Sequence, residues 1–82
     1  MSEARILLSS LKPGASALVC GFLDHSSDRQ LSSRMMEMGL TLGSQIEVAF
    51  EAPFGGAIAV RCRGTLIALR LDDAAIVEVR AL

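Results

Sequence analysis

Residues 33–48 read SRMMEMGLTLGSQIEV, and within them the spacing of apolar residues changes from that of a helix to that of a strand. Leu31, Met35 and Met38 lie at i, i+4 and i+7, which predicts one apolar stripe along a helix. Gly39 follows at once, and glycine favours the left-handed conformation that often ends a helix. Beyond the next glycine, apolar residues alternate with others, which indicates a strand.

The rest of the chain predicts five short strands in all, with one helix after the first. The expected strands are Ala15–Leu23, Ser44–Glu51, Ala57–Arg63, Thr65–Arg70 and Ile76–Arg80. The helix is expected at Asp28–Met38, and a 3₁₀ turn is expected within Leu71–Ala75. Leu18, Cys20 and Phe22 alternate along the first strand, so we expect them on its inward face.

The second and third strands are expected to form a hairpin whose register puts apolar residues on one face. The expected inward pairs are Phe50 with Ile58, Val48 with Val60, and Ile46 with Cys62. The same register places Glu47 opposite Arg61 on the outer face, which is a favourable cross-strand pair. Together these elements predict a mainly β fold, a small and partly open five-stranded barrel. The pattern alone does not separate an SH3-like barrel from an OB-like one.

The composition predicts a single small domain. The chain has 82 residues, of which 51% are hydrophobic, and a net charge of −1. We expect one domain over residues 1–82, with residues 1–7 frayed, although Ile6, Leu7 and Leu8 could pin this end to the core. The sequence has no apolar run near the ~20 residues of a membrane span and no signal-peptide pattern at its start, which predicts a cytoplasmic protein. Cys20 and Cys62 lie far apart, and we expect reduced, buried thiols.

A polar loop at residues 24–28 leads into the expected helix. Ser27 with Gln30 fits a capping box, and Asp28 adds negative charge near the positive end of the helix dipole. The loop also holds His25, the single histidine of the chain. Such residues are typical of a solvated capping loop, and we interpret His25 in this way.

The sequence offers little for catalysis or metal binding. Asp72 and Asp73 are typical of the start of a short helical turn, and no phosphate-loop pattern accompanies the glycines. Ferrous iron usually takes histidine and carboxylate ligands, and Asp24, His25 and Asp28 could form only a weak, exposed site. We therefore predict no catalytic residue, no bound cofactor and no functional metal site.

Two binding classes are disfavoured because the chain has no Trp or Tyr. A groove for polyproline peptides and a platform for single-stranded nucleic acid both need aromatic side chains. Three arginines could form a basic strip on the third and fourth strands, partly neutralised by two glutamates of the second. These residues are Arg61, Arg63 and Arg70 with Glu47 and Glu51. We interpret them as a solvated mixed face.

A protein-binding role has more support. Met36 lies off the apolar stripe, and Phe54 lies at the tip of the expected hairpin, where the turn does not require an aromatic residue. Exposed Met and Phe side chains are adaptable contact residues. The alternative is that Met36 and Leu40 close the end of the barrel and that Phe54 folds back over Pro53. Both interpretations remain open at this point.

The chain also resembles the FeoA family, small cytosolic proteins of ferrous iron uptake. The resemblance covers residues 8–80. Its main part is Arg34 with Met38-Gly39-Leu40 and Gly43. The other matching segments are Leu11–Gly14, Ala52–Gly56, Arg63-Gly64, Ile67–Arg70 and Ala74–Val79. Met35 stands where the family usually has Leu, and Leu42 where a proline often precedes the turn glycine. Both changes keep an apolar residue.

The residues above predict that the protein is not an enzyme. The resemblance implies an SH3-like barrel that binds the cytosolic GTPase part of the FeoB membrane transporter. The residues that we expect at this contact are Arg34, Met36, Leu40, Pro53, Phe54 and Gly55. Two alternatives remain. The module also resembles the C-terminal domain of DtxR-type metal-dependent repressors, where it serves as a regulatory part. An RNA-binding small barrel is the other alternative, and a net charge of −1 disfavours it.

Overall fold

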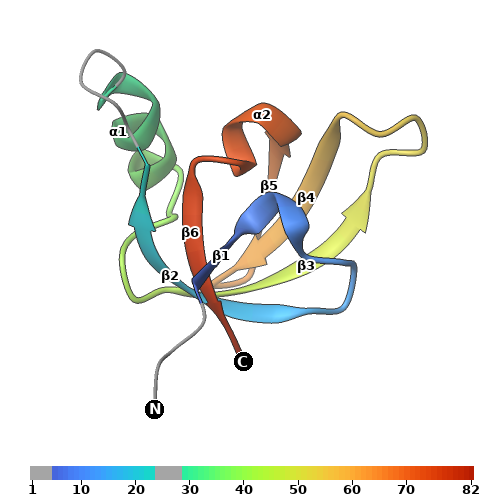
Figure 1. Ribbon diagram of the computed structural model, residues 1–82, viewed down its shortest axis with the longest axis horizontal. Helices are drawn as coiled ribbons and strands as arrows, with labels where there is room; N and C mark the ends of the chain where they lie inside the picture. Colours follow the sequence, from blue (N-terminus) through green and yellow to red (C-terminus); the bar gives the residue numbers. More distant parts are fainter. Residues whose placement is uncertain (1–4, 24–28) are drawn as a thin grey trace.

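The computed structural model of the protein describes residues 5–23 and 29–82. The elements in chain order are β1 (Arg5–Leu7), η1 (Leu8–Ser10), β2 (Ser16–Phe22), α1 (Arg29–Glu37), β3 (Gln45–Glu51), β4 (Ala57–Cys62), β5 (Thr65–Arg70), α2 (Leu71–Ala74) and β6 (Val77–Ala81). The strands curve around a common core, with α1 at one side and α2 above the sheet in Figure 1. The mainly β fold expected from the sequence is confirmed.

The strands form one antiparallel sheet in the order β1-β6-β2-β3-β4-β5. The sequence predicted five strands, and β1 is the additional one. Arg5–Leu7 pairs with β6, so the expectation that this segment is frayed is wrong. Three residues are too few to show an alternating pattern, and their pairing partner lies at the far end of the chain.

The end of α1 is held by a Schellman motif. Gly39 has φ 113°. Its N–H donates to the carbonyl of Met36 at 3.1 Å, and the N–H of Leu40 donates to the carbonyl of Met35 at 2.9 Å. Met35 and Leu40 are both fully buried, which supplies the apolar contact that accompanies this motif. The helix stop predicted at Gly39 is confirmed.

Hydrogen bonds then join the turn after α1 to the sheet. The N–H of Gly43, at φ 84°, donates to the carbonyl of Val19 at 2.8 Å. The N–H of Val19 donates in return to the carbonyl of Ser44 at 2.9 Å. The Cys62 thiol lies 3.5 Å from the carbonyl oxygen of Gly39. This turn therefore sets the position of α1 against β2 and β4.

The predicted apolar stripe of the helix is only partly confirmed. Met35 is fully buried, whereas Met38 follows the last residue of α1 and is 45% exposed. The helix expected from Asp28 begins at Arg29 among the described residues. The side chain of Leu31 and the Ser27–Gln30 capping box lie outside what the structure describes.

A β-bulge in β2 changes which residues of this strand face the core. Ala17 and Val19 are buried, while Leu18 and Cys20 are half-buried, so the predicted inward face is wrong for these two. The pairing with β6 shifts between Val19 and Gly21, so that Phe22 shares the inward face with Val19 although three positions separate them. Nearly every residue of β2 is apolar, so the sequence has no alternation that identifies the inner face.

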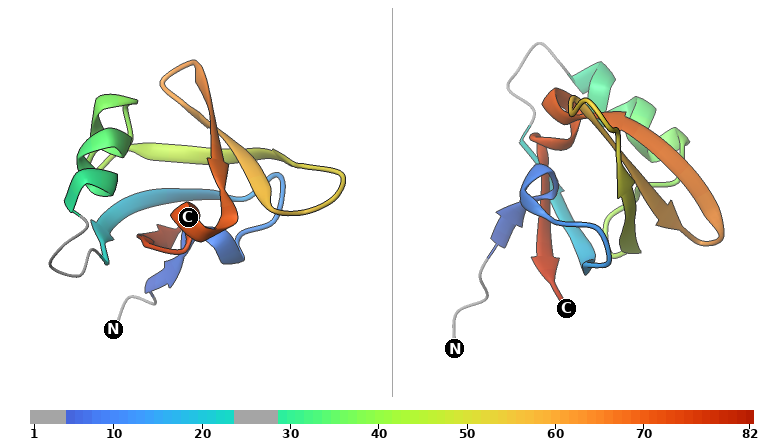
Figure 2. Two further views of the ribbon diagram at one scale, coloured as in Figure 1. Left: turned by 90° about the horizontal axis from the view of Figure 1, so that it is seen from above. Right: turned by 90° about the vertical axis from the view of Figure 1, so that its right-hand side faces the viewer.

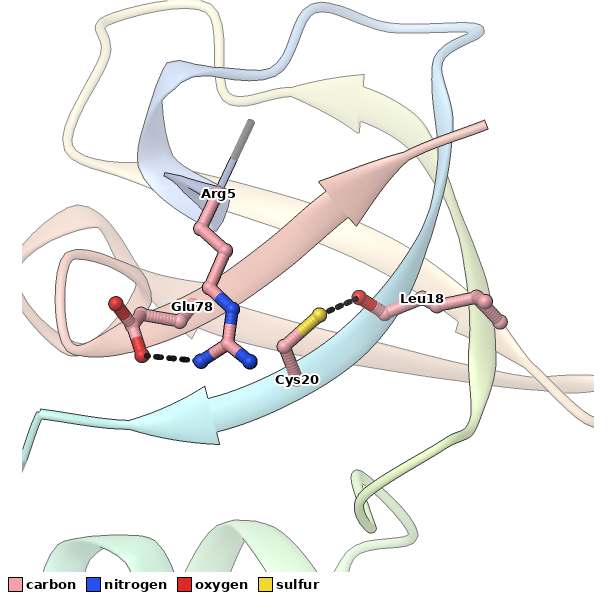
Figure 3. Close-up of polar contacts among 4 residues, drawn as sticks. All are labelled: Arg5, Leu18, Cys20 and Glu78. Carbon is pink, nitrogen blue, oxygen red and sulfur yellow. Dashed lines mark hydrogen bonds and ion pairs between the residues drawn. The ribbon is translucent and has the colours of Figure 1, made fainter. Parts of the chain in front are cut away.

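The outer face of β2 carries Cys20. Its thiol lies 3.6 Å from the carbonyl oxygen of Leu18, near an ion pair of 3.7 Å between Arg5 on β1 and Glu78 on β6 (Figure 3). Cys62 is buried, as expected, and both cysteines are free thiols. The expectation of a buried thiol is wrong for Cys20, which lies on the face that the bulge leaves outward.

A second bulge divides the predicted β3–β4 register into a correct part and a wrong part. The pairs Ile46–Cys62, Glu47–Arg61 and Val48–Val60 are confirmed, and Glu47 and Arg61 form an ion pair of 3.4 Å. Beyond Val48 the register shifts, so that Phe50 lies opposite Ala59 instead of Ile58. Phe50 is consequently turned outward and is 53% exposed. An inserted residue cannot be seen in a pattern that assumes strict alternation.

Met35→Ala tests the importance of the buried end of α1. We expect this change to lower the free energy of unfolding by about 2–5 kcal/mol, because it leaves a cavity beneath the helix. Met36→Ala is the matched control: this neighbouring side chain is 41% exposed, so its loss should change stability by no more than about 0.5 kcal/mol. Chemical denaturation measures both, and equal losses would contradict this account of α1.

Candidate functional site

The end of α1 and the turn after it form the first candidate contact surface, the α1 end. Met36, Met38 and Leu42 are 41%, 45% and 61% exposed. Arg34 lies in the last turn of α1 and is also exposed. Since the Schellman motif fixes the turn, these apolar side chains are presented by a rigid backbone.

Leu40 does not belong to this surface. The sequence-based prediction placed it among the partner-binding residues, but its side chain is fully buried beside Met35. Its place is due to the Schellman motif, in which the residue after the glycine packs back on the helix. The prediction for Leu40 is therefore corrected. Its buried side chain packs beneath the α1 end and is not accessible to a partner.

The loop between β3 and β4, residues 52–56, forms the second candidate contact surface, the β3–β4 loop. Gly55 and Gly56 have φ 78° and 81°, and the N–H of Gly55 donates to the carbonyl of Ala52 at 3.0 Å. Pro53, Phe54 and Gly55 are all exposed, and Phe54 is 102% exposed. The alternative in which Phe54 folds back over Pro53 is therefore wrong.

These two surfaces do not form one patch. Figure 1 shows α1 at one end of the molecule's longest dimension and the β3–β4 loop at the other, and the left-hand view of Figure 2 agrees. That dimension is 33 Å. The structure therefore places Arg34 and Met36 on either side of the buried Met35 near the end of α1. It separates both from Pro53, Phe54 and Gly55.

The structure also has an apolar hollow that the sequence did not predict, on the outer face of β3, β4 and β5. Its volume is about 280 Å³, and it is lined by Phe50, Ala52, Ala57, Ile58, Ala59, Leu66 and Ala68. Leu66 is 51% exposed, and its outward position could have been predicted from the alternation along β5. The outward position of Phe50 could not have been predicted in this way, because it depends on the bulge in β3.

The arginines near these strands are already paired or hydrogen-bonded. Arg61 pairs with Glu47, and Arg70 pairs with Asp73 at 3.8 Å. Arg63 donates to the hydroxyl oxygens of Ser44 and Thr41, at 3.3 and 3.5 Å. The face is thus mixed in charge, in keeping with its interpretation as a solvated face.

The candidate metal residues cannot be placed, since Asp24, His25 and Asp28 lie outside the described residues. Within residues 5–23 and 29–82, no group of three or more His, Cys, Asp or Glu side chains could hold a metal ion. Asp72 and Asp73 occupy the first turn of α2, so the expected acidic start of a helical turn is confirmed. The turn is a short α-helix and not the expected 3₁₀ turn, because the N–H of Ala75 donates to the carbonyl of Leu71, four residues before it. No helix in this part of the chain is long and apolar enough to cross a membrane.

The fold is an SH3-like barrel, and comparison with known proteins identifies its family. Residues 6–81 match the model of the FeoA domain, so the chain belongs to the FeoA family, which is related to iron transport. No curated protein matches the chain.

Solved structures agree with this assignment. A FeoA-like protein from Clostridium acetobutylicum is 29% identical, with a TM-score of 0.85 over 100% of this chain and 91% of that one. The zinc complex of Stenotrophomonas maltophilia FeoA is 30% identical, with a TM-score of 0.78 over 90% of this chain and 88% of that one. The latter protein is described as a prokaryotic SH3 domain protein and a possible ferrous iron transport activating factor.

The same fold occurs within metal-dependent repressors. A manganese-dependent transcriptional repressor bound to manganese is 22% identical, with a TM-score of 0.86. The match covers 99% of this chain but only 38% of the repressor. At this level of identity the likeness shows the fold alone.

Phe50→Ala tests the outward position that the bulge gives to Phe50. We expect a loss of less than about 1 kcal/mol in the free energy of unfolding, since half of the ring is already in water. Ile46→Ala, on the inward face of the same strand, should cost about 2–5 kcal/mol. A loss of about 3–5 kcal/mol for Phe50→Ala, as for a core phenylalanine, would show that β3 keeps the unbulged register in solution.

Proposed function

We propose that this chain is a cytoplasmic accessory protein of ferrous iron uptake that binds the cytosolic GTPase part of the FeoB membrane transporter. Its membership in an iron-transport family supports this function. The ion is handled by the transporter, and this chain acts through protein contact rather than through catalysis. Binding biases the nucleotide state or the assembly of the transporter.

The α1 end is the observation that carries this proposal. Three large apolar side chains and an arginine are exposed around one helix end whose backbone is fixed by hydrogen bonds. Methionine side chains adapt to irregular partner surfaces, and arginine is enriched among the residues that dominate binding energy. Because the turn is already ordered, binding here costs little backbone entropy.

The β3–β4 loop provides a second, separate contact. Phe54 is fully exposed at its tip, and an aromatic side chain in this position has no packing role within the described chain. Since the loop and the α1 end lie at opposite ends of the molecule, a partner that uses both must span this small domain.

The repressor-like alternative rests on the fold alone. In the manganese-dependent repressor the matching segment is a minor part of a longer chain. Nothing in the surfaces described above points to a role within such a chain, so we do not adopt this function.

The double variant Arg34→Ala/Met36→Ala tests the α1 end. We expect it to remain folded and to lose binding to the FeoB GTPase region by at least about tenfold, because it removes the arginine and an adaptable apolar contact together. Isothermal titration calorimetry measures the affinity, and circular dichroism checks the fold.

Arg61→Ala/Leu66→Ala is the matched control, since it removes an exposed arginine and an exposed apolar residue from β4 and β5, outside the α1 end. It should keep the wild-type affinity. Undiminished binding by the folded Arg34/Met36 variant would rule out the α1 end as the contact.

Phe54→Ala tests the loop independently. We expect unchanged stability, because the ring is fully exposed, and weaker binding of the GTPase region by several-fold. In heteronuclear NMR spectra of the labelled wild type, the GTPase region should shift resonances of both the α1 end and Phe54. Shifts confined to the α1 end would remove the loop from the proposed contact.

A further inference from the structure

β5 lies at one edge of the sheet with little to protect it from pairing with another strand. Within residues 5–23 and 29–82, β4 is the only strand that pairs with β5. Natural proteins guard such edges with lysine, proline, a bulge or a very short strand. β5 has six residues, TLIALR, in regular register with β4, and its single charge is at the last position. The opposite edge, β1, has only three residues.

The directions of the backbone groups along β5 follow from its hairpin with β4. Arg63 and Gly64, with φ 54° and 80°, form the tight turn between Cys62 and Thr65. A turn of this kind closes on a hydrogen-bonded pair, and every second pair after it is hydrogen-bonded. The N–H of Leu71 donates to the carbonyl of Gly56 at 2.9 Å. This bond fits the same alternation of hydrogen-bonded pairs at the other end of the β4–β5 hairpin.

Two sets of residues therefore alternate along β5. Thr65, Ile67 and Leu69 direct their N–H and C=O groups toward β4. Leu66 and Ala68 direct both groups toward the outer edge, and all three of Leu66, Ala68 and Arg70 have exposed side chains on the outer face. Arg70 directs its N–H toward the edge, whereas its carbonyl, at the N-cap of α2, belongs to the first turn of that helix. Ala68 is the middle one of these three residues.

The outer face beside this edge is apolar. Leu66 and Ala68 border the hollow, and Phe50 lies across it. Ala59 lines the hollow and is only 3% exposed, although it does not belong to the core cluster. Its burial comes from the side chains around it on the outer face. The edge and the hollow thus form one continuous surface.

The charges around this surface are balanced within the chain. Arg61 is paired with Glu47 on one side of the hollow, and Arg70 with Asp73 on the other. A surface without net charge does not select a strongly charged partner, and it does not repel a copy of itself.

We propose that β5 pairs antiparallel with β5 of a second copy of this chain, with the two-fold axis at Ala68. In this register Ala68 lies opposite Ala68 of the second copy, and Leu66 lies opposite Arg70. The N–H and C=O groups of Ala68, the C=O of Leu66 and the N–H of Arg70 then form hydrogen bonds between the two copies. The two hollows open on the same side of the joined sheet, and the aliphatic stem of each Arg70 covers the Leu66 opposite it.

Sedimentation velocity over a range of protein concentrations tests this pairing with the chain alone, so its result is independent of transporter binding. We expect a monomer–dimer equilibrium. Ala68→Lys places two lysines opposite each other at the axis and should weaken the dimer by roughly tenfold. Gln45→Lys is the matched control, because it adds the same charge at an exposed position of β3, away from the β5 edge. This variant should leave the dimer intact.

Amide hydrogen exchange by NMR identifies the strand involved. At high concentration the N–H groups of Leu66, Ala68 and Arg70 should become protected, whereas those of Ile67 and Leu69 should be protected at every concentration. A chain that stays monomeric, assemblies larger than a dimer, or equal association of the two lysine variants would overturn the proposal. The proposal would also be overturned if the exchange rates of the Leu66, Ala68 and Arg70 N–H groups did not depend on protein concentration.

Discussion

The arrangement of the molecule depends on the left-handed backbone at Gly39. A φ of 113° is strained for any residue with a side chain, and here it ends α1 and reverses the chain. The reversal stacks Leu40 on Met35, and these two fully buried side chains connect the helix to the barrel core. The following turn is hydrogen-bonded to β2 through Gly43 and Val19. Without this geometry the α1 end would have no fixed position.

Two β-bulges determine which apolar side chains are exposed. The bulge in β2 returns Phe22 to the inward face and leaves Cys20 outside. The bulge in β3 has the opposite result, since it turns Phe50 out to border the hollow. In a chain of 82 residues such local shifts decide whether an aromatic side chain stabilises the core or remains available for contact.

The exposed apolar surfaces differ in what surrounds them. The α1 end joins flexible methionines to an arginine on a fixed turn, which suits a foreign protein surface. The β5 edge offers backbone groups and a neutral apolar face, which suits a strand of the same sequence. Because they lie on different elements, the proposed pairing through β5 leaves the α1 end free for the proposed contact with a transporter domain.

Much of the fold is determined locally and was predictable. Gly39 and Gly43 mark the turn, and the pairs from Ile46–Cys62 to Val48–Val60 follow from alternation along two adjacent strands. The sequence also indicated the exposure of Phe54 and Met36 as one of two alternatives. The tertiary structure alone decided the pairing of Arg5–Leu7 with β6, the outward turn of Phe50, the burial of Leu40 and the separation of the two contact surfaces. The physical reason is that sequence patterns report the periodicity of each element, whereas bulges, long-range strand pairing and the packing of one element on another depend on residues far apart in the chain.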